Sequence, residues 1–248
     1  KNWVVRVLGP AVGYAITRIL PLAEPYVVVV FLCSLAPCAP FLQQMVDKAR
    51  GDMGFAGAFV PLVMVGTVVL MPMMAPLLIT GVTISTWSLA KPLLLTILLP
   101  LIIGAAIRHF ADQAATKIFP AVKGLALIST LLTIGACLLL YGRGMLDTAG
   151  ELALLSMTLF MVGMGLITYR FGFGMKQNQR SVMALGMGTR NIAAVLAAAL
   201  AIPNGDSRIV VMTVLWTLWS VALAAIGAKI FAKLAGKVSA TLFGRTQV

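Results

Sequence analysis

The chain has 248 residues, of which 60% are hydrophobic and 10% are charged, and its mean hydropathy is +1.02. Repeated apolar runs of about 20 residues, together with this composition, exclude a soluble globular domain and predict a polytopic helical membrane protein. A net charge of +12 would suggest nucleic acid as the partner of a soluble protein, but here the basic residues lie mainly in loops and at helix ends. We therefore expect membrane lipids, and no nucleic acid, as its surroundings.

Hydropathy predicts an all-α fold with about eight transmembrane helices. They cover residues 3–22, 26–46, 54–80, 92–110, 120–141, 151–172, 181–203 and 209–234. With these spans, 14 of the 19 basic residues lie on the side of Lys1, 4 lie on the other side, and Arg190 remains inside the membrane. The positive-inside rule then predicts that both termini lie in the cytoplasm. We expect an integral membrane protein of a bacterial inner membrane.

The eight spans divide into three, two and three. Residues 1–80 form a first core triplet, residues 91–141 form two further helices, residues 150–235 form a second core triplet, and residues 236–248 form a cytoplasmic tail. The first triplet enters from the cytoplasm and the last from outside, as in transporters built from inverted repeats.

The middle span of each triplet is interrupted. In the second span, two prolines three residues apart each remove a backbone donor and open the helix, and in the seventh span glycines weaken it. Interruptions at corresponding positions of opposed repeats point to a binding site where the two spans cross. The residues assigned to this broken-helix geometry are Pro37, Cys38, Ala39, Pro40, Gly186 and Gly188.

Arg190 stands in the middle of the seventh span, directly after the glycines. A guanidinium near the bilayer centre costs about 3 kcal/mol on insertion scales, so it faces a partner, a water-filled cavity or a substrate path. Two interpretations remain open. Arg190 is either a clamp for a carboxylate or related oxyanion, or a permanent ion pair or carbonyl cap, for example with Asp47 or the opened backbone of the second span.

At the two interruptions the sequence resembles the bile acid:sodium symporter family. The first crossing helix of that family carries PGGxxSN and then a Gly-Asp or Gly-Asn turn, matched here by Pro37-Cys-Ala-Pro-Phe-Leu-Gln43 and Gly51-Asp52. Its second crossing helix carries ExGxQN, matched by Gly186-Met-Gly-Thr-Arg-Asn191. The resemblance covers nearly the whole chain and matches the third to tenth helices of the family. It implies that the two broken helices cross in a core domain and that residues 91–141 are panel-type helices.

The resemblance implies sodium as a possible coupling ion, but its ligand positions are degraded in this sequence. Gly186 stands where the family has its sodium-binding glutamate, Arg190 where it has a glutamine, and Leu42-Gln43 where it has Ser-Asn. A hard cation prefers a cage of oxygen ligands, and a fixed positive charge nearby repels it. We therefore expect no cofactor, no metal site and no need for sodium.

We expect the anion to be bound by Arg190, Asn191, Thr189 and Gln43. Gln43 holds the motif position, and at most one of Gln43 and Gln44 faces the cavity directly, because neighbouring helix positions point in different directions. For Thr189, a hydrogen bond back to its own helix is favoured over a substrate contact. Weaker candidates, for which packing is favoured, are Thr67, Trp216, Trp219 and Ser220.

These features predict a secondary transporter that moves a small organic anion by alternating access. The alternative is a non-transporting membrane module that binds or senses the anion with the same fold. An enzyme is not expected, because the sequence has no HExxH motif, no paired intramembrane carboxylates and no Ser/His arrangement. Bile acids, keto acids, pantoate-like acids and sulfated compounds all fit the resemblance, and the sequence leaves the substrate and the oligomeric state open.

Overall fold

The computed structural model describes residues 2–39, 41–78, 85–148, 152–172, 174–203 and 205–245. Within these ranges the regular elements are all helices, and one isolated β-bridge joins two connecting segments. The helices are α1 (Asn2–Ile19), α2 (Glu24–Leu35), α3 (Leu42–Lys48), α4 (Met53–Leu78), α5 (Thr86–Leu93), the π-helical η1 (Leu94–Leu98), α6 (Leu99–Phe110), α7 (Asp112–Thr148), α8 (Leu154–Arg170), α9 (Gln177–Gly188), α10 (Ile192–Leu200) and α11 (Ser207–Arg245).

The prediction of an all-α polytopic membrane protein is confirmed. Within the described residues, each predicted span overlaps one helix or a consecutive set of helices. Three helical segments are by themselves long and apolar enough to cross a membrane, namely Met53–Leu77, Thr86–Phe110 and Ser207–Gly236. Glu24–Leu35 and Leu154–Arg170 are shorter apolar helices. How the eight spans divide into domains stays a prediction.

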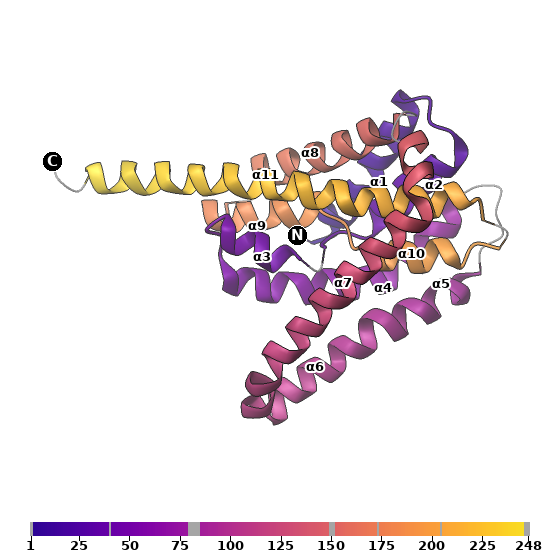
Figure 1. The fold of residues 1–248 in the computed structure, drawn as a ribbon. Coiled ribbons are helices and arrows are strands. Elements are labelled where there is room, and N and C mark those ends of the chain that lie inside the picture. Colours follow the sequence, from indigo (N-terminus) through magenta and orange to yellow (C-terminus); the bar gives the residue numbers. More distant parts are fainter. Residues whose placement is uncertain are drawn as a thin grey trace.

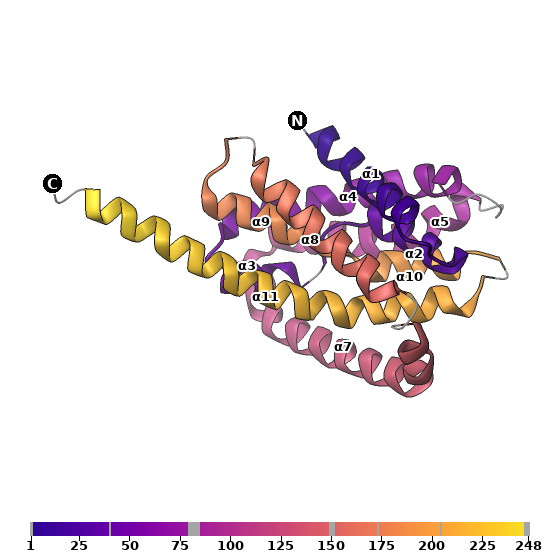
Figure 2. The same ribbon diagram turned by 90° about the horizontal axis from the view of Figure 1, so that it is seen from above.

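Several boundaries differ from the predicted ones; for example, α7 covers Asp112–Thr148, whereas the predicted span covers residues 120–141. The fourth span is predicted to begin at Pro92. The helix α5 instead begins at Thr86 and contains Pro92 in its interior. Membrane helices tolerate such prolines, since neighbouring groups satisfy the carbonyl that the proline frees. At the other end, residues 236–245, expected as a tail, continue α11 as a helix that projects beyond the bundle (Figures 1 and 2).

Most of the helices pack into one bundle with a continuous apolar core, to which α2, α4, α8, α9, α10 and α11 contribute buried side chains. The long helix α11 runs along the bundle, and α8 and α9 lie beside it (Figure 1). The short helices α3 and α10 are also packed against α11. The interrupted helices therefore lie inside the bundle, where other helices cover their breaks.

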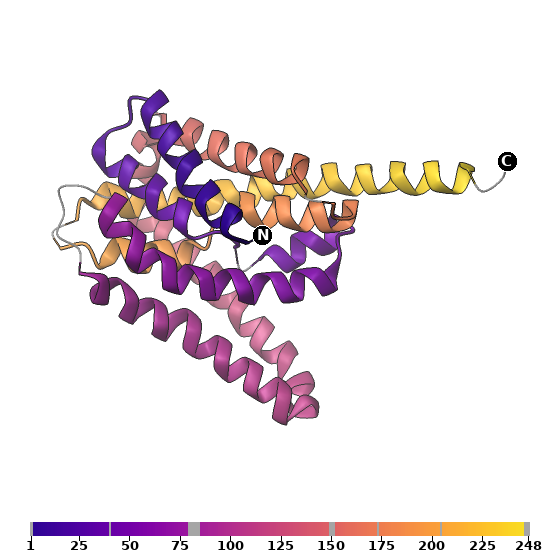
Figure 3. The same cartoon turned by 180° about the vertical axis from the view of Figure 1, so that it is seen from behind.

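Helices α6 and α7 form a hairpin that diverges from this bundle (Figures 1 and 3). No residue of α6 is buried. Many large apolar side chains of the hairpin are exposed, among them Ile102, Ile103, Phe110, Phe119, Leu125, Leu131, Leu132, Leu139 and Leu140. Such a surface suits lipid and would be costly in water.

Candidate functional site

The first interruption lies between α2 and α3. Helix α2 ends at Leu35, because the residue before a proline disfavours the helical conformation and Pro37 has no backbone N–H. Cys38 has a φ of 76°, in the left-handed region that glycine accepts readily and other residues rarely adopt. The motif that the sequence resembles has glycine at this position, a residue that accepts this conformation without strain. Pro40 lies outside the described residues.

The second interruption lies between α9 and α10. Helix α9 ends at Gly188, and Thr189 continues in an extended conformation. Asn191 is the N-cap of α10, where its side-chain oxygen accepts a hydrogen bond from the backbone N–H of Ala194 at 3.3 Å. A side-chain oxygen at this position satisfies one of the free donors of a helix start. Both interruptions thus begin and end at definite residues.

The two interruptions lie side by side, as predicted. The N–H of Cys38 donates to the carbonyls of Gly186 at 2.9 Å and Thr189 at 3.0 Å, and the N–H of Asn191 donates to the carbonyl of Ala36 at 2.8 Å. Pro37 and Arg190 form an antiparallel bridge. We call residues 36–39 and 189–191 the crossing. Each interruption satisfies backbone groups that the other one frees, which is what non-helical backbone at membrane depth requires.

Arg190 is fully buried beside the crossing, with 0% of its surface exposed. Its Nη2 donates to the carbonyl of Met187, in the last turn of α9. Its Cζ lies 4.5 Å from the centroid of the Phe160 ring, within the range of a cation–π interaction. Its Nε and Nη1 are buried and have no hydrogen-bond partner in the described part of the chain.

The ion-pair interpretation of Arg190 is not realised among the described residues. There the ion pairs are Arg108–Asp112 and Arg208–Asp206, both with exposed side chains. Asp47, the predicted partner, is exposed on α3. The carbonyl-cap interpretation is realised in part, because Arg190 caps a carbonyl of α9 in its own span and not a carbonyl of the second span. The guanidinium charge therefore has no acidic counterpart in what the structure describes.

Phe160 contacts the guanidinium and Trp216 packs behind Phe160, and sequence reasoning missed Phe160. Phe160 of α8 contacts Arg190 on one side and the ring of Trp216 of α11 on the other, with ring centroids 5.9 Å apart at an angle of 72°. Both aromatic residues are fully buried, and Trp216 Nε1 also lacks a hydrogen-bond partner in the described chain. In the sequence, Phe160 is one of several large apolar residues of α8, and no motif marks it as a contact of Arg190. The site thus combines an aromatic contact with two guanidinium nitrogens that have no partner in the described chain.

Two other predicted site residues, Thr189 and Gln43, do not contact the guanidinium of Arg190 through a described hydrogen bond. The hydroxyl of Thr189 donates to the carbonyl of Leu185 at 2.8 Å and accepts from the N–H of Ala39 at 3.2 Å. The favoured interpretation of Thr189, a bond back to its own helix, is confirmed. Gln43 and Gln44 are both exposed on α3. No described hydrogen bond joins Gln43 to Arg190, so its place in the site stays a prediction.

Gly186 and Gly188 permit close packing at the second interruption. A Cβ atom at Gly186 would lie 2.5 Å from Cε1 of Phe59 and 3.2 Å from Cδ2 of Leu42. A Cβ atom at Gly188 would lie 3.2 Å from the carbonyl oxygen of Met161. The side chains of Phe59 and Leu42 therefore occupy the space into which a longer residue at position 186 would extend.

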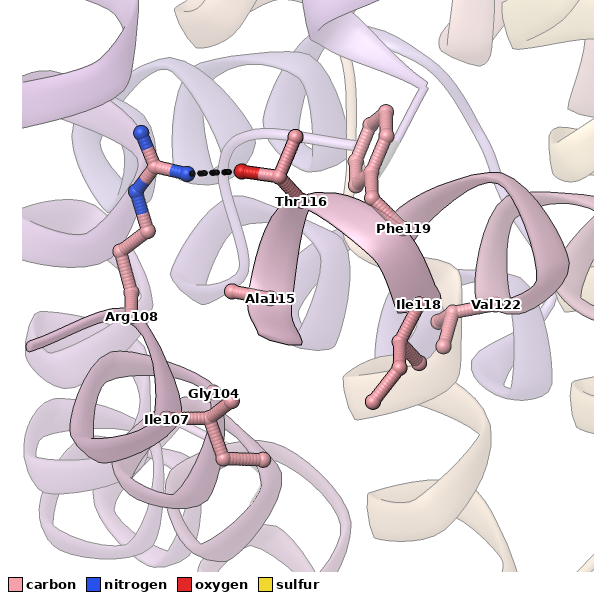
Figure 4. Close-up of a pocket in the computed structure, with 8 residues that line it drawn as sticks. All are labelled: Gly104, Ile107, Arg108, Ala115, Thr116, Ile118, Phe119 and Val122. Atoms are coloured by element: carbon pink, nitrogen blue, oxygen red, sulfur yellow. Dashed lines mark hydrogen bonds between the residues drawn. The ribbon is translucent and has the colours of Figure 1, made fainter. Parts of the chain in front are cut away.

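A separate cleft opens between α6 and α7 (Figure 4). Its lining is apolar except for Arg108 and Thr116, whose side chains hydrogen-bond at 3.4 Å. The lining residues are Gly104, Ile107, Arg108, Ala115, Thr116, Ile118, Phe119 and Val122. None of them is a predicted site residue. The crossing, and not this cleft, is the candidate functional site.

Asp52 links the start of α4 to α9. Its Oδ1 accepts from the backbone N–H of Phe55 at 2.9 Å, in the first turn of α4, and its Oδ2 accepts from Nε2 of Gln179 in α9 at 3.3 Å. These two hydrogen bonds, first the one from Phe55, hold the pKa of the Asp52 carboxyl below its ordinary value. Asp52 is therefore an ionised cap that also contacts the second broken helix.

Comparison with known proteins supports one family. Residues 1–147 match the model of the sodium bile acid symporter family. The matched part includes the first interruption and ends before α8, so Arg190 and the second interruption lie outside it. The comparison with curated proteins finds no match. Because the match covers more than half of the 248 residues, the chain belongs to the sodium bile acid symporter family, a family of membrane transporters.

Proposed function

We propose that the protein is a secondary transporter that moves a small organic anion by alternating access, and that Arg190 binds the negative group of the anion. The observation that carries the proposal is the fully buried guanidinium whose Nε and Nη1 have no partner in the described chain. Membership of a transporter family supports transport in general. The buried cation supports an anion as the transported solute.

The chemistry of the site favours an acceptor-rich ligand. Arg190 Nε and Nη1 are both donors, and an unpaired buried donor is costly. A carboxylate, sulfonate or sulfate group offers several acceptor oxygens with a charge opposite to that of the guanidinium. The rings of Phe160 and Trp216 are suited to an apolar body attached to that group.

Arg190 is enclosed in this conformation, so the anion reaches it only when the surrounding packing opens. Two broken helices that meet at one point, each in one triplet of an inverted repeat, support a motion that opens the site to either side in turn. We further propose that both termini lie in the cytoplasm, as the distribution of basic residues predicts.

Transport is proposed to be independent of sodium. The space beside Gly186, where the resemblance places the sodium-binding glutamate, is occupied by Phe59 and Leu42. A permanent cation at position 190 disfavours a second cation nearby. Replacing sodium by potassium or choline at constant ionic strength should therefore leave anion binding unchanged, whereas a steep and saturable sodium requirement would contradict this part of the proposal.

The proposal is tested first by binding. The purified protein is heated in detergent with taurocholate, pyruvate, pantoate or p-nitrophenyl sulfate, and with an uncharged analogue of each as a control. At least one anion should raise the unfolding temperature in a saturable manner while its uncharged analogue does not. If none of the anions stabilises the protein more than its analogue, the anion site is refuted.

The second test is flux. Uptake of the labelled anion that binds best is followed in proteoliposomes and compared with liposomes that lack protein. Protein-dependent uptake is expected. Saturable binding without any uptake would instead support the alternative, a membrane module that binds or senses the anion.

A further inference from the structure

The charge of Arg190 is permanent. A lysine or a histidine can lose its proton when it is enclosed without a partner, but the guanidinium of arginine remains protonated. The polar side chains at the crossing, those of Thr189 and Asn191, are neutral and already bonded to backbone groups. Among the described residues, none of the acidic side chains forms an ion pair with Arg190.

Helix dipoles do not cancel this charge. Helices α2 and α9 end at the crossing and bring partial negative charge, whereas α3 and α10 begin there and bring partial positive charge. These contributions oppose each other in pairs. The carbonyl of Met187 and the ring of Phe160 stabilise the guanidinium by hydrogen bonding and cation–π attraction, but neither carries a full negative charge. The enclosed site retains close to one positive charge.

This residual charge affects the two halves of a transport cycle differently. When an anion is bound, the site encloses a neutral pair. When no anion is bound, the site must enclose a cation without a counter-charge, which is much less favourable in a medium of low dielectric constant. The protein therefore changes between its inward-open and outward-open forms faster with an anion bound than with the site empty.

We propose, on the basis of the function proposed above, that the protein is an anion exchanger in which one anion leaves as another enters on the opposite side. The partner of each transported anion is then a second anion of the same class, and no cation is needed to balance the charge. In each half-cycle the negative group of one anion passes from one aqueous side to Arg190 and on to the other side. The second half-cycle returns an anion of equal charge, so the complete exchange moves no net charge across the membrane.

Proteoliposomes test the exchange directly. Vesicles containing the purified protein are loaded either with buffer or with an unlabelled anion, and uptake of the same anion in labelled form is measured. The probe is whichever of taurocholate, pyruvate, pantoate and p-nitrophenyl sulfate binds best. Valinomycin with equal potassium on both sides clamps the membrane potential, so that charge movement does not limit net uptake into the buffer-loaded vesicles.

Uptake into anion-loaded vesicles should be at least about tenfold faster than uptake into buffer-loaded vesicles. A tenfold difference in rate needs only part of the free energy that burying an unpaired charge costs. Equal rates in the two kinds of vesicle would overturn the exchange proposal while leaving the transporter proposal intact. Binding with no uptake in either kind of vesicle would overturn both.

Arg190→Lys provides a second measurement, used after its unfolding temperature confirms that it is folded. The lysine can release its proton in the enclosed site, so the empty form loses its unpaired charge. At saturating anion, the ratio of exchange to net uptake should fall towards one, although the affinity is lower. A ratio as high as that of the wild type would show that the permanent charge of Arg190 is not what enforces exchange.

Discussion

The crossing and the α6–α7 hairpin have opposite distributions of polarity. At the crossing, Arg190, Thr189 and Asn191 are buried. On the hairpin, α6 buries no residue and apolar side chains such as Leu139 are exposed. In a soluble protein both arrangements would be unfavourable, but in a membrane an exposed apolar surface is ordinary and a buried charge is costly. The difference shows that the hairpin presents an apolar surface suited to lipid, whereas the crossing encloses a charge that the fold alone does not explain.

The largest expected difference in stability concerns two helix glycines, one in the bundle and one in the hairpin. A Cβ atom at Gly9 of α1 would lie 2.5 Å from the backbone carbonyl oxygen of Ser34, just before the crossing, whereas one at Gly124 of α7 would have no atom within 4 Å. Overpacking against backbone costs about 1–3 kcal/mol, while alanine in an open helix gains about 1 kcal/mol over glycine. Gly9→Ala should lower the thermal unfolding temperature in detergent and Gly124→Ala should leave it unchanged or raise it. Equal shifts would show that the bundle is not packed as described.

A smaller effect is expected at Cys38, whose φ of 76° is unusual for a residue with a Cβ atom. Cys38→Gly and Cys38→Ala both remove the thiol, but only alanine keeps the strained Cβ. The glycine variant should therefore be more stable than the alanine variant by about 1 kcal/mol. Thermal unfolding of the two variants side by side measures this difference, and an alanine variant that is the more stable of the two would refute the left-handed conformation at the crossing.

Sequence reasoning predicted the position of the crossing, but it predicted only some of the side chains that surround Arg190. The prolines around Cys38 and the glycines before Arg190 mark the interruptions because their effects on the backbone are local. Phe160 could not be predicted, since its contact with Arg190 depends on how α8 packs against α9. Gln43 was selected by motif position, but the structure exposes its side chain on α3. Tertiary packing, which local patterns do not encode, decides such details.

A weaker, pH-dependent effect is expected at Asp52. Its pKa is lower in the folded protein than its ordinary value of 3.8, so its contribution to stability is complete above about pH 4 and is lost as the pH falls through the folded pKa. Asparagine is also a good helix cap but does not titrate. The unfolding temperature of Asp52→Asn should thus approach that of the wild type as the pH is lowered from 7 to 3. A difference that stays constant over this range would contradict the role of the carboxylate.

The smallest effect is expected on the hairpin, at the ion pair of Arg108 and Asp112. Their atoms Nη1 and Oδ1 are 2.8 Å apart, but the side chains are 68% and 64% exposed. Exposed pairs of this kind contribute about 0.5 kcal/mol or less. Arg108→Ala should leave the unfolding temperature within about 1–2 °C of the wild type in detergent. A loss as large as that of Gly9→Ala would remove the contrast between the two regions.

The central claim, that Arg190 binds the negative group of the transported anion, is tested most directly by the affinity of Arg190→Gln. Titration calorimetry would compare the wild type, Arg190→Gln and Arg190→Lys, each first shown by thermal unfolding to be folded in detergent, with whichever anion binds the wild type best. Removing one partner of a buried charge pair costs about 3–5 kcal/mol, so Arg190→Gln should bind about a hundredfold or more weakly. Arg190→Lys should recover only part of the affinity, because a point charge does not replace the planar guanidinium. A folded Arg190→Gln protein that binds the anion with wild-type affinity would contradict the account.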